Sequence, residues 1–366
     1  MEEKGKKGRM DYTLLLIVVL LVVIGLVILY STSAYNGQVK FHDSFYYLKK
    51  QAFATVLGIV LMLFVAGMDY HIWQRLAVFG YLAAVALSVA VMLFGREING
   101  SKRWLALGPF SFQPSEFAKV ALILFLADLV TKNVKTIGKM WTLCRIMFWI
   151  LPIVGLVGAS NLSTAIIILG IGVILIFVAS PKYAQFALMG IAGACFMGIF
   201  LALESYRLER LAIWRNPEKY EKGYQTLQGL YAIGSGGVFG VGIGNSVQKL
   251  GFVPEAQNDM IFSIICEEMG LTGAIILILI FALLLWRLCV ISMNCQELSG
   301  AMIAAGIMGH LAIQVILNIA VVTNTIPNTG ITLPFISYGG TSIVFLLGEM
   351  GLALNVSRQK NNPPTR

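Results

Sequence analysis

Asp259 is the residue whose type and setting point most clearly to chemistry. It lies where the polar segment Pro254–Asn258 meets the uncharged run Met260–Ile265. A carboxylate in such an apolar setting has a raised pKa unless nearby cations offset the effect, so Asp259 is a candidate general base near neutral pH. The same position also suits an N-cap of the following helix, and the sequence leaves both interpretations open.

Two more acidic residues, Glu267 and Glu268, follow inside the same apolar segment. Carboxylates at membrane depth are costly, and by default they mark function. We favour a structural interpretation here, a buried pair bonded to other helices. The glycine-rich stretch 234–244 precedes them, but it lacks both the Gly-Lys-Ser/Thr sequence and the preceding strand of a phosphate-binding loop.

The segment 99–119 contains a second set of ionisable residues. Pro114 and Ser115 indicate a helix start, and Glu116 and Lys119 lie on one face of that helix, where they can pair. Arg103–Trp104 suits either a substrate site or an interfacial anchor. A solvated loop followed by a capped helix explains the segment equally well.

The segment 321–342 is irregular, because Pro327, Gly330 and Pro334 forbid a continuous helix. Non-helical backbone at membrane depth is tolerated only where it is buried in protein or lines a cavity. Just before it, three polar residues lie four positions apart on one helix face: His310, Gln314 and Asn318. We favour interhelical hydrogen bonding over a proton relay for this face.

The composition requires a membrane around these segments. Of 366 residues, 58% are hydrophobic and 12% charged, and the mean hydropathy is +0.80, which excludes a soluble enzyme of this length. The net charge of +9 is spread over loops between apolar runs, which favours membrane orientation and anionic lipid over nucleic acid. The cysteines show no CxxC spacing, so they read as buried small hydrophobes.

We therefore predict an all-α integral membrane protein, a single domain over 1–366 with a bundle of about ten transmembrane helices. The expected spans are 12–31, 51–68, 76–94, 114–131, 143–159, 161–180, 184–204, 259–287, 299–322 and 340–356.

Counting Lys and Arg on alternate sides puts the larger share on the side of the two termini. The tails 1–11 and 357–366 are therefore expected in the cytoplasm, and the long loop 205–258 outside. On this orientation all three unusual segments lie on the outer face, so a site that they share would be extracytoplasmic.

These segments resemble the SEDS family of division, elongation and sporulation proteins. The matching motifs are NGSKRWL, QPSEFAK, GYQ, IGSGG, PEAQND followed by FxxxxEExG, and NTIPNTGITLPFISYGGTS, in order and across nearly the whole chain. Within the family, the sequence is most similar to the division or sporulation branch, as GYQ, NTIPNTG and the basic N-terminal extension indicate.

The resemblance implies a peptidoglycan glycosyltransferase of the bacterial cytoplasmic membrane that polymerises lipid II on the outer face during septal cell-wall synthesis. Asp259 matches the family's catalytic aspartate, and as general base it would support inversion at the donor anomeric carbon. The implied partners are lipid II, a class B penicillin-binding protein and divisome proteins.

Further expectations concern substrate binding and a cation. The substrate-binding candidates are Arg103, Trp104, Glu116, Lys119, Arg210, Lys249, Glu255, Gln257 and Ser337. Among them, Arg103, Lys119, Arg210 and Lys249 could neutralise the leaving pyrophosphate, a role that Mg²⁺ or Mn²⁺ could also fill. The sequence identifies no metal site. Asn161 stands where many family members have an aspartate, so no role of that carboxylate carries over.

Two other functions stay open. A lipid II flippase would also need a polar, partly irregular bundle core, although no inverted repeat is visible. A non-catalytic scaffold for the penicillin-binding protein would fit the fold but would leave Asp259 unexplained.

Overall fold

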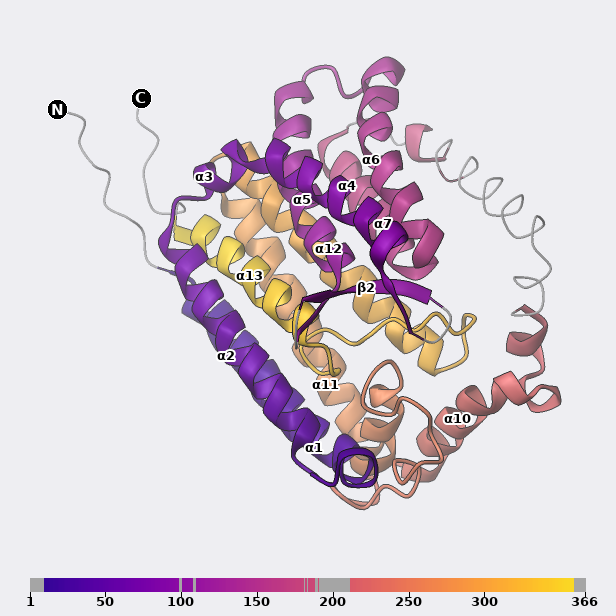
Figure 1. Cartoon of the computed structure of the whole chain (residues 1–366). Helices are drawn as coiled ribbons and strands as arrows, with labels where there is room; N and C mark the ends of the chain where they lie inside the picture. The colour runs from indigo at the N-terminus through magenta and orange to yellow at the C-terminus, as the bar shows by residue number, and fades with distance from the viewer. Residues whose placement is uncertain are drawn as a thin grey trace.

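The computed structural model describes residues 10–98, 101–107, 110–180, 182, 184–187, 190 and 211–358. The chain forms a helical bundle with both described ends of the chain on the same side (Figure 1). At that side, the backbone N–H of Asp11 donates to Ser357 Oγ and Asp11 forms an ion pair with Arg287. An even number of membrane crossings follows.

Within the described residues, eight helices are long and apolar enough to span a membrane, which confirms the predicted fold class. They are α1 (Tyr12–Phe41), α2 (Tyr46–Gly67), α4 (Ala77–Phe94), α6 (Met140–Ser160), α7 (Leu162–Ala179), α11 (Ile261–Asn294), α12 (Leu298–Val322) and α13 (Gly340–Ser357). The predicted span 184–204 falls almost wholly outside the described residues. The assignment of 205–258 to the outside and of both tails to the cytoplasm stays a prediction.

Helix α5 (Pro114–Asn133) carries more charge than these eight, and it runs through the bundle. It begins at Pro114 as predicted, where a proline loses no intrahelical hydrogen bond. Its residues Ala118, Leu122 and Leu126 are fully buried, as expected of a helix enclosed by its neighbours. The charged pair of Glu116 and Lys119 is buried with them.

The turn between α6 and α7 falls between the predicted spans 143–159 and 161–180. Helix α6 ends at Ser160, and the side chain of Asn161 accepts a hydrogen bond from the N–H of Thr164 as the N-cap of α7. The polar interruption in a charge-free run therefore marks a change of direction.

A small antiparallel sheet follows α4. The sequence did not predict this sheet. It contains β1 (Arg96–Ile98), β2 (Ser101–Leu107) and β3 (Phe110–Phe112), with β2 in the middle. Arg103 Nε on β2 donates to the carbonyl of Ser160 at 3.2 Å, which ties the sheet to the α6–α7 turn.

Helix α11 corrects the predicted span 259–287. It begins at Ile261, and it breaks at Gly270, whose φ of 65° and ψ of −167° are not helical. Glu267 and Glu268 therefore lie in a short segment before the break, separate from the long helix that follows. Helix α1 likewise extends ten residues beyond its predicted end at 31, to Phe41.

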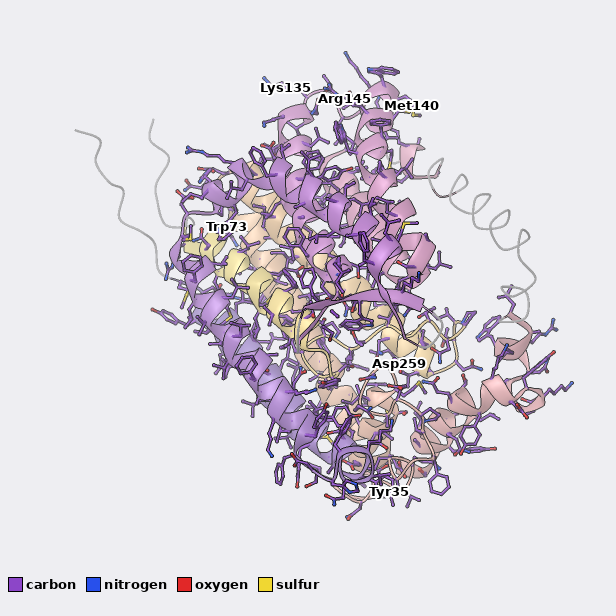
Figure 2. The ribbon with its side chains drawn as sticks, viewed as in Figure 1. Tyr35, Trp73, Lys135, Met140, Arg145 and Asp259 are labelled. Carbon is purple, nitrogen blue, oxygen red and sulfur yellow. The ribbon has the colours of Figure 1, made fainter. Side chains whose placement is uncertain are left out.

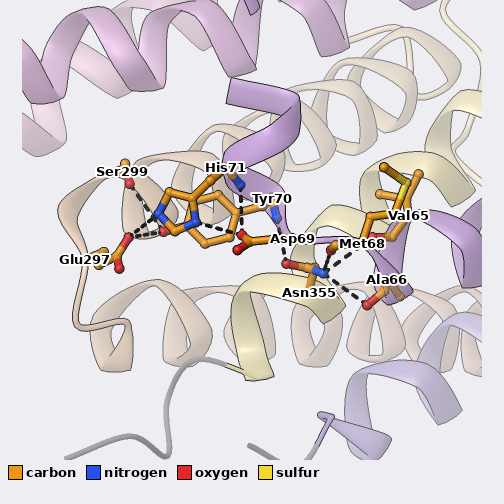
Figure 3. A network of polar contacts seen from close by, with 9 residues as sticks. All are labelled: Val65, Ala66, Met68, Asp69, Tyr70, His71, Glu297, Ser299 and Asn355. Carbon is orange, nitrogen blue, oxygen red and sulfur yellow. Dashed lines mark hydrogen bonds and ion pairs between the residues drawn. The ribbon is translucent and has the colours of Figure 1, made fainter. Parts of the chain in front are cut away.

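The shorter elements are α3 (Tyr70–Arg75), the 3₁₀ turns η1 (Pro217–Lys219) and η2 (Glu221–Gly223), and α10 (Tyr224–Gly236). Near α3, a polar network joins three helices at the terminal end of the bundle (Figure 3). Asn355 of α13 accepts from the N–H of Tyr70 and donates to the carbonyl of Ala66, while His71 contacts Glu297 at 2.7 Å. These contacts hold the ends of α2, α12 and α13 together.

We expect Gly270→Ala to destabilise the protein, because a Cβ at this position would lie 2.4 Å from Gly240 N and the residue has a positive φ. Strain at such a backbone position is of order 1–3 kcal/mol. The control is Gly155→Ala in α6, where a Cβ meets nothing within 4 Å. Thermal unfolding in detergent should show a lower melting temperature for Gly270→Ala alone, and equal melting temperatures would contradict the break at Gly270.

Candidate functional site

A cavity of about 1660 Å³ opens in the half of the bundle away from the termini. Its wall is built from α2, the sheet, α5, α7, α12, the segments 213–226 and 255–259, the irregular segment 324–339 and the start of α13. In Figure 2, Asp259 lies on the Tyr35 side of the bundle, whereas Lys135 and Arg145 lie at the opposite end. Lys135 and Arg145 therefore lie far from the cavity.

Asp259 lines this cavity although only 8% of its surface is exposed. Its backbone is held in place by Asn318 of α12, whose Nδ2 donates to the carbonyl of Asp259 at 2.9 Å and to that of Ile331 at 2.7 Å. Asn318 is itself fully buried. One amide side chain thus joins α12, the start of α11 and the irregular segment.

The environment of Asp259 favours a protonated carboxyl group. Its pKa is raised to about 7, first by burial and then by the nearby negative charge of Glu255, while backbone hydrogen bonds and a hydrogen bond from Gln225 act in the opposite direction. A carboxylate with a pKa near 7 can both accept and release a proton at neutral pH.

Gln225 of α10 is the polar neighbour on the cavity side of Asp259. Its Nε2 lies 3.4 Å from Asp259 Oδ1 and 3.5 Å from Oδ2, so the contact is long. Its Oε1 accepts from Asn328 Nδ2 at 3.2 Å. Gln225 therefore bridges the carboxylate and the irregular segment without holding the carboxylate tightly.

Glu255 lines the cavity in an unusual backbone conformation, with φ at 54°. Such a conformation is uncommon for a residue other than glycine, and strain of this kind clusters at functional sites. Here it is stabilised by Asn258, whose backbone N–H and side-chain amide both donate to Glu255.

A chain of buried polar side chains leads from the cavity into the bundle. Glu116 and Lys119 form an ion pair at 3.0 Å, and Lys119 Nζ also donates to Gln314 Oε1 at 3.3 Å. His310 contacts the same oxygen at 2.9 Å through Nε2, and Glu349 at 2.8 Å through Nδ1. The polar face of α12 thus makes interhelical contacts, as expected.

The structure brings most of the predicted site residues together. Arg103, Trp104, Glu116, Lys119, Glu255 and Asp259 all line the cavity. The assigned roles of these residues stay predictions. Arg210 lies outside the described residues.

Three predicted residues do not line the cavity, which corrects their expected placement. Lys249 pairs with Glu268 at 2.6 Å, because a buried ammonium group needs a counter-charge. Gln257 Oε1 accepts from Asn36, and Ser337 Oγ donates to the carbonyl of Asn258 at 2.6 Å. These three side chains hold the non-helical segments in place.

Several cavity residues were not predicted. Lys49 and Lys50 of α2 and Lys222 before α10 add positive charge to the wall, and Gln225 contacts Asp259. Two adjacent lysines at the start of a span are a usable signal for such a site, although in the sequence they served only to predict membrane orientation. In the sequence, Gln225 was noted only as the last residue of the GYQ motif, without a role of its own.

The described residues contain no group of three or more His, Cys, Asp or Glu side chains that could hold a metal ion. Three carboxylates line the cavity; Glu116 pairs with Lys119, and the other two are Glu255 and Asp259. Mg²⁺ is often bound by one or two carboxylates together with substrate phosphates, so these residues fit a cation that enters with its substrate.

Residues 12–362 match the family of cell cycle proteins that comprises FtsW, RodA and SpoVE. The chain is 40% identical to the stage V sporulation protein E of Bacillus subtilis, over 96% of this chain and 98% of the relative. It is 34% identical to a probable peptidoglycan glycosyltransferase FtsW of Saccharophagus degradans, over 96% of this chain and 94% of the relative.

Two solved structures are similar over nearly the whole chain. One is a chain from a peptidoglycan synthase complex that coordinates polymerization and crosslinking, with 30% identity, a TM-score of 0.83, and 97% of this chain and 99% of that chain covered. The other is the rod shape determining protein RodA of Thermus thermophilus, with 28% identity, a TM-score of 0.72, and coverage of 97% and 98%.

We expect Asn318→Ala to lower the melting temperature in detergent, because it removes two buried hydrogen bonds to backbone carbonyls. Leaving such groups unpaired costs about 1–3 kcal/mol each. The matched control is Asn294→Ala, since Asn294 bonds only within its own helix at an exposed position. Activity per folded molecule should persist in part, and a fully stable but inactive Asn318→Ala protein would show that this residue acts in the chemistry.

Proposed function

Because the chain belongs to the FtsW, RodA and SpoVE family of cell cycle proteins, we propose that it is a peptidoglycan glycosyltransferase that polymerises lipid II with Asp259 as the general base. It is a multi-pass protein of the bacterial cytoplasmic membrane. Its relatives named FtsW and SpoVE favour a role in division or sporulation.

The observation that carries the proposal is the placement of Asp259. It is a nearly buried carboxylate with a pKa of about 7, in the wall of a cavity larger than the roughly 300–1000 Å³ of a small-molecule site. A helix cap alone would not need such a cavity. The room suits two large sugar headgroups side by side.

The reaction needs one base and no covalent intermediate. Asp259 takes the proton of the acceptor 4-hydroxyl as its oxygen attacks the anomeric carbon of the donor. The new carbon–oxygen bond forms while the bond to the phosphate oxygen breaks, and undecaprenyl pyrophosphate leaves with the electron pair. Direct displacement inverts the anomeric configuration.

Positive charge in the cavity wall supports departure of the pyrophosphate. Arg103 extends from β2, and Lys49 and Lys50 from the end of α2. Lys119 is buried in an ion pair with Glu116, so Glu116 largely neutralises its charge, whereas the ion pair of Lys49 with Asp43 is exposed and therefore weaker. We therefore assign the leaving group to the region of Arg103 and the two α2 lysines.

A divalent cation is part of the proposal as an additional charge. Mg²⁺ or Mn²⁺ would neutralise the leaving pyrophosphate when bound. Glu255 is the residue to hold it, because Asp259 must stay able to accept a proton.

The proposed partner is a class B penicillin-binding protein that crosslinks the new strands. Support comes from the similar chain in a synthase complex that coordinates polymerization and crosslinking. Lipid II is the proposed substrate, and the other division proteins are proposed contacts of the complex.

We expect Asp259→Asn to lower glycan polymerisation from labelled lipid II by about 10²–10⁴-fold, the usual contribution of a general base. Asparagine keeps the shape and any capping bond but cannot take the proton. The matched control is Asp128→Asn on α5, since Asp128 pairs with Lys132 at the surface. It should polymerise at the wild-type rate.

Two outcomes would contradict this assignment. Near-normal synthesis by a folded Asp259→Asn protein would leave Asp259 as a helix cap. If the wild-type protein moves lipid II across vesicles but forms no polymer with its partner present, the chain is a flippase.

Polymerisation should fall as the pH drops below about 7, because Asp259 is then protonated and cannot act as a base. Glu255→Gln removes a neighbouring negative charge that raises this pKa, so the midpoint should move to lower pH. Glu218→Gln, at an exposed position in η1, should leave the midpoint unchanged. An unchanged midpoint in Glu255→Gln would remove Glu255 from the electrostatics of the base.

A further inference from the structure

The segment 237–252, here called the glycine loop, buries polar side chains and exposes apolar ones. Two of its four polar side chains, Ser246 and Lys249, are buried, whereas its large apolar side chains face outward. Phe239 is 82% exposed. The exposed apolar set is Val238, Phe239, Val241, Ile243, Val247, Leu250 and Phe252. A loop in water normally shows the opposite pattern, so this surface faces an apolar medium or partner.

Charge is absent from this surface over a long stretch. Between Gly223 and Pro254 the sequence contains a single charged residue, Lys249. Its Nζ is buried against Glu268 at 2.6 Å and Ser31 Oγ at 2.9 Å. The glycine loop therefore presents no ionised group to its surroundings.

The depth of the loop follows from its contact with α11. The N–H of Thr272 donates to the carbonyl of Val238 at 3.0 Å, so these residues lie at the same level. Residues 272 to 287 of a helix span about 22 Å. Arg287 is the first charged residue after Glu268, and it pairs with Asp11 at the terminal end of the bundle. In a hydrocarbon core of about 30 Å, Val238 then lies below the far surface.

Several backbone groups of the loop meet the condition for this depth, which is that polar groups are paired within the protein. The N–H groups of Val241 and Gly242 donate to the carbonyls of Glu267 and Glu268, and that of Leu271 donates to the carbonyl of Gly237. Such close approach needs glycine. A Cβ on Gly240 would lie 2.2 Å from the carbonyl oxygen of Glu268.

The apolar surface also continues onto a helix that faces lipid. Leu271, Ile275 and Leu279 of α11 are exposed directly beyond the break. We propose that residues 237–243 form a re-entrant wedge, with Val238, Phe239 and Val241 in contact with acyl chains of the outer leaflet. The expected extracytoplasmic loop is thus partly a membrane-embedded element.

The test measures depth by spin labelling in lipid nanodiscs, on a full-length chain whose cysteines are replaced. Labels are placed at Phe239→Cys and Val241→Cys, with Leu279→Cys as the lipid-facing reference. Asn245→Cys is the matched control on the same loop, since Asn245 is its exposed polar residue. The collision rates with oxygen and with a water-soluble nickel chelate are compared for each site.

The wedge predicts that Phe239 and Val241 collide with oxygen several-fold more than with the nickel chelate, like Leu279, whereas Asn245 favours the chelate. Because two positions are labelled, a local distortion caused by one label does not decide the result. Chelate access at Phe239 and Val241 equal to that at Asn245 would place the surface in water. Shielding from both reagents only when the partner transpeptidase is added would make it a protein interface, and either result overturns the wedge.

Discussion

The structure depends on one constraint: each backbone polar group of a non-helical segment inside the bundle needs a partner from the protein. The irregular segment meets it through side chains, since Gln314 donates to the carbonyl of Thr332 and Ser337 accepts from the N–H of Leu333. Asn318 does the same for Asp259 and Ile331. These side-chain contacts take the place of the hydrogen bonds that a helix would make within itself. They allow a non-helical segment to form part of the cavity wall.

Local signals in the sequence predicted much of this. Proline and glycine between residues 327 and 340 act through their own backbone preferences, so the irregular segment was readable without its neighbours. The helix start at Pro114 was predicted for the same reason. Asp259 was found because a single carboxylate at the edge of an apolar run is costly wherever the chain folds.

Long-range contacts account for what could not be predicted. Lys249 was expected to neutralise the leaving pyrophosphate, but its partners Glu268 and Ser31 are brought to it only by the fold. The break at Gly270 depends on the approach of Gly240 and Val238, and no local pattern reveals it. The sheet arises from three strands too short for a clear alternation. Lys49 and Lys50 were assigned to orientation alone, since their place beside the cavity follows from the packing of α2.

The contrast between the backbone and the side chain of Asp259 has a consequence for turnover. Its carbonyl is fixed by Asn318 at 2.9 Å, whereas the contact of its carboxylate with the Gln225 side chain is long, at 3.4 Å. The acidic group is therefore held less tightly by other side chains than the backbone that carries it. Side-chain rotations are among the faster protein motions, while helix shifts take microseconds or longer. Deprotonation of the proposed base between successive sugar additions then requires no rearrangement of the bundle, which suits an enzyme that adds many units to one growing strand.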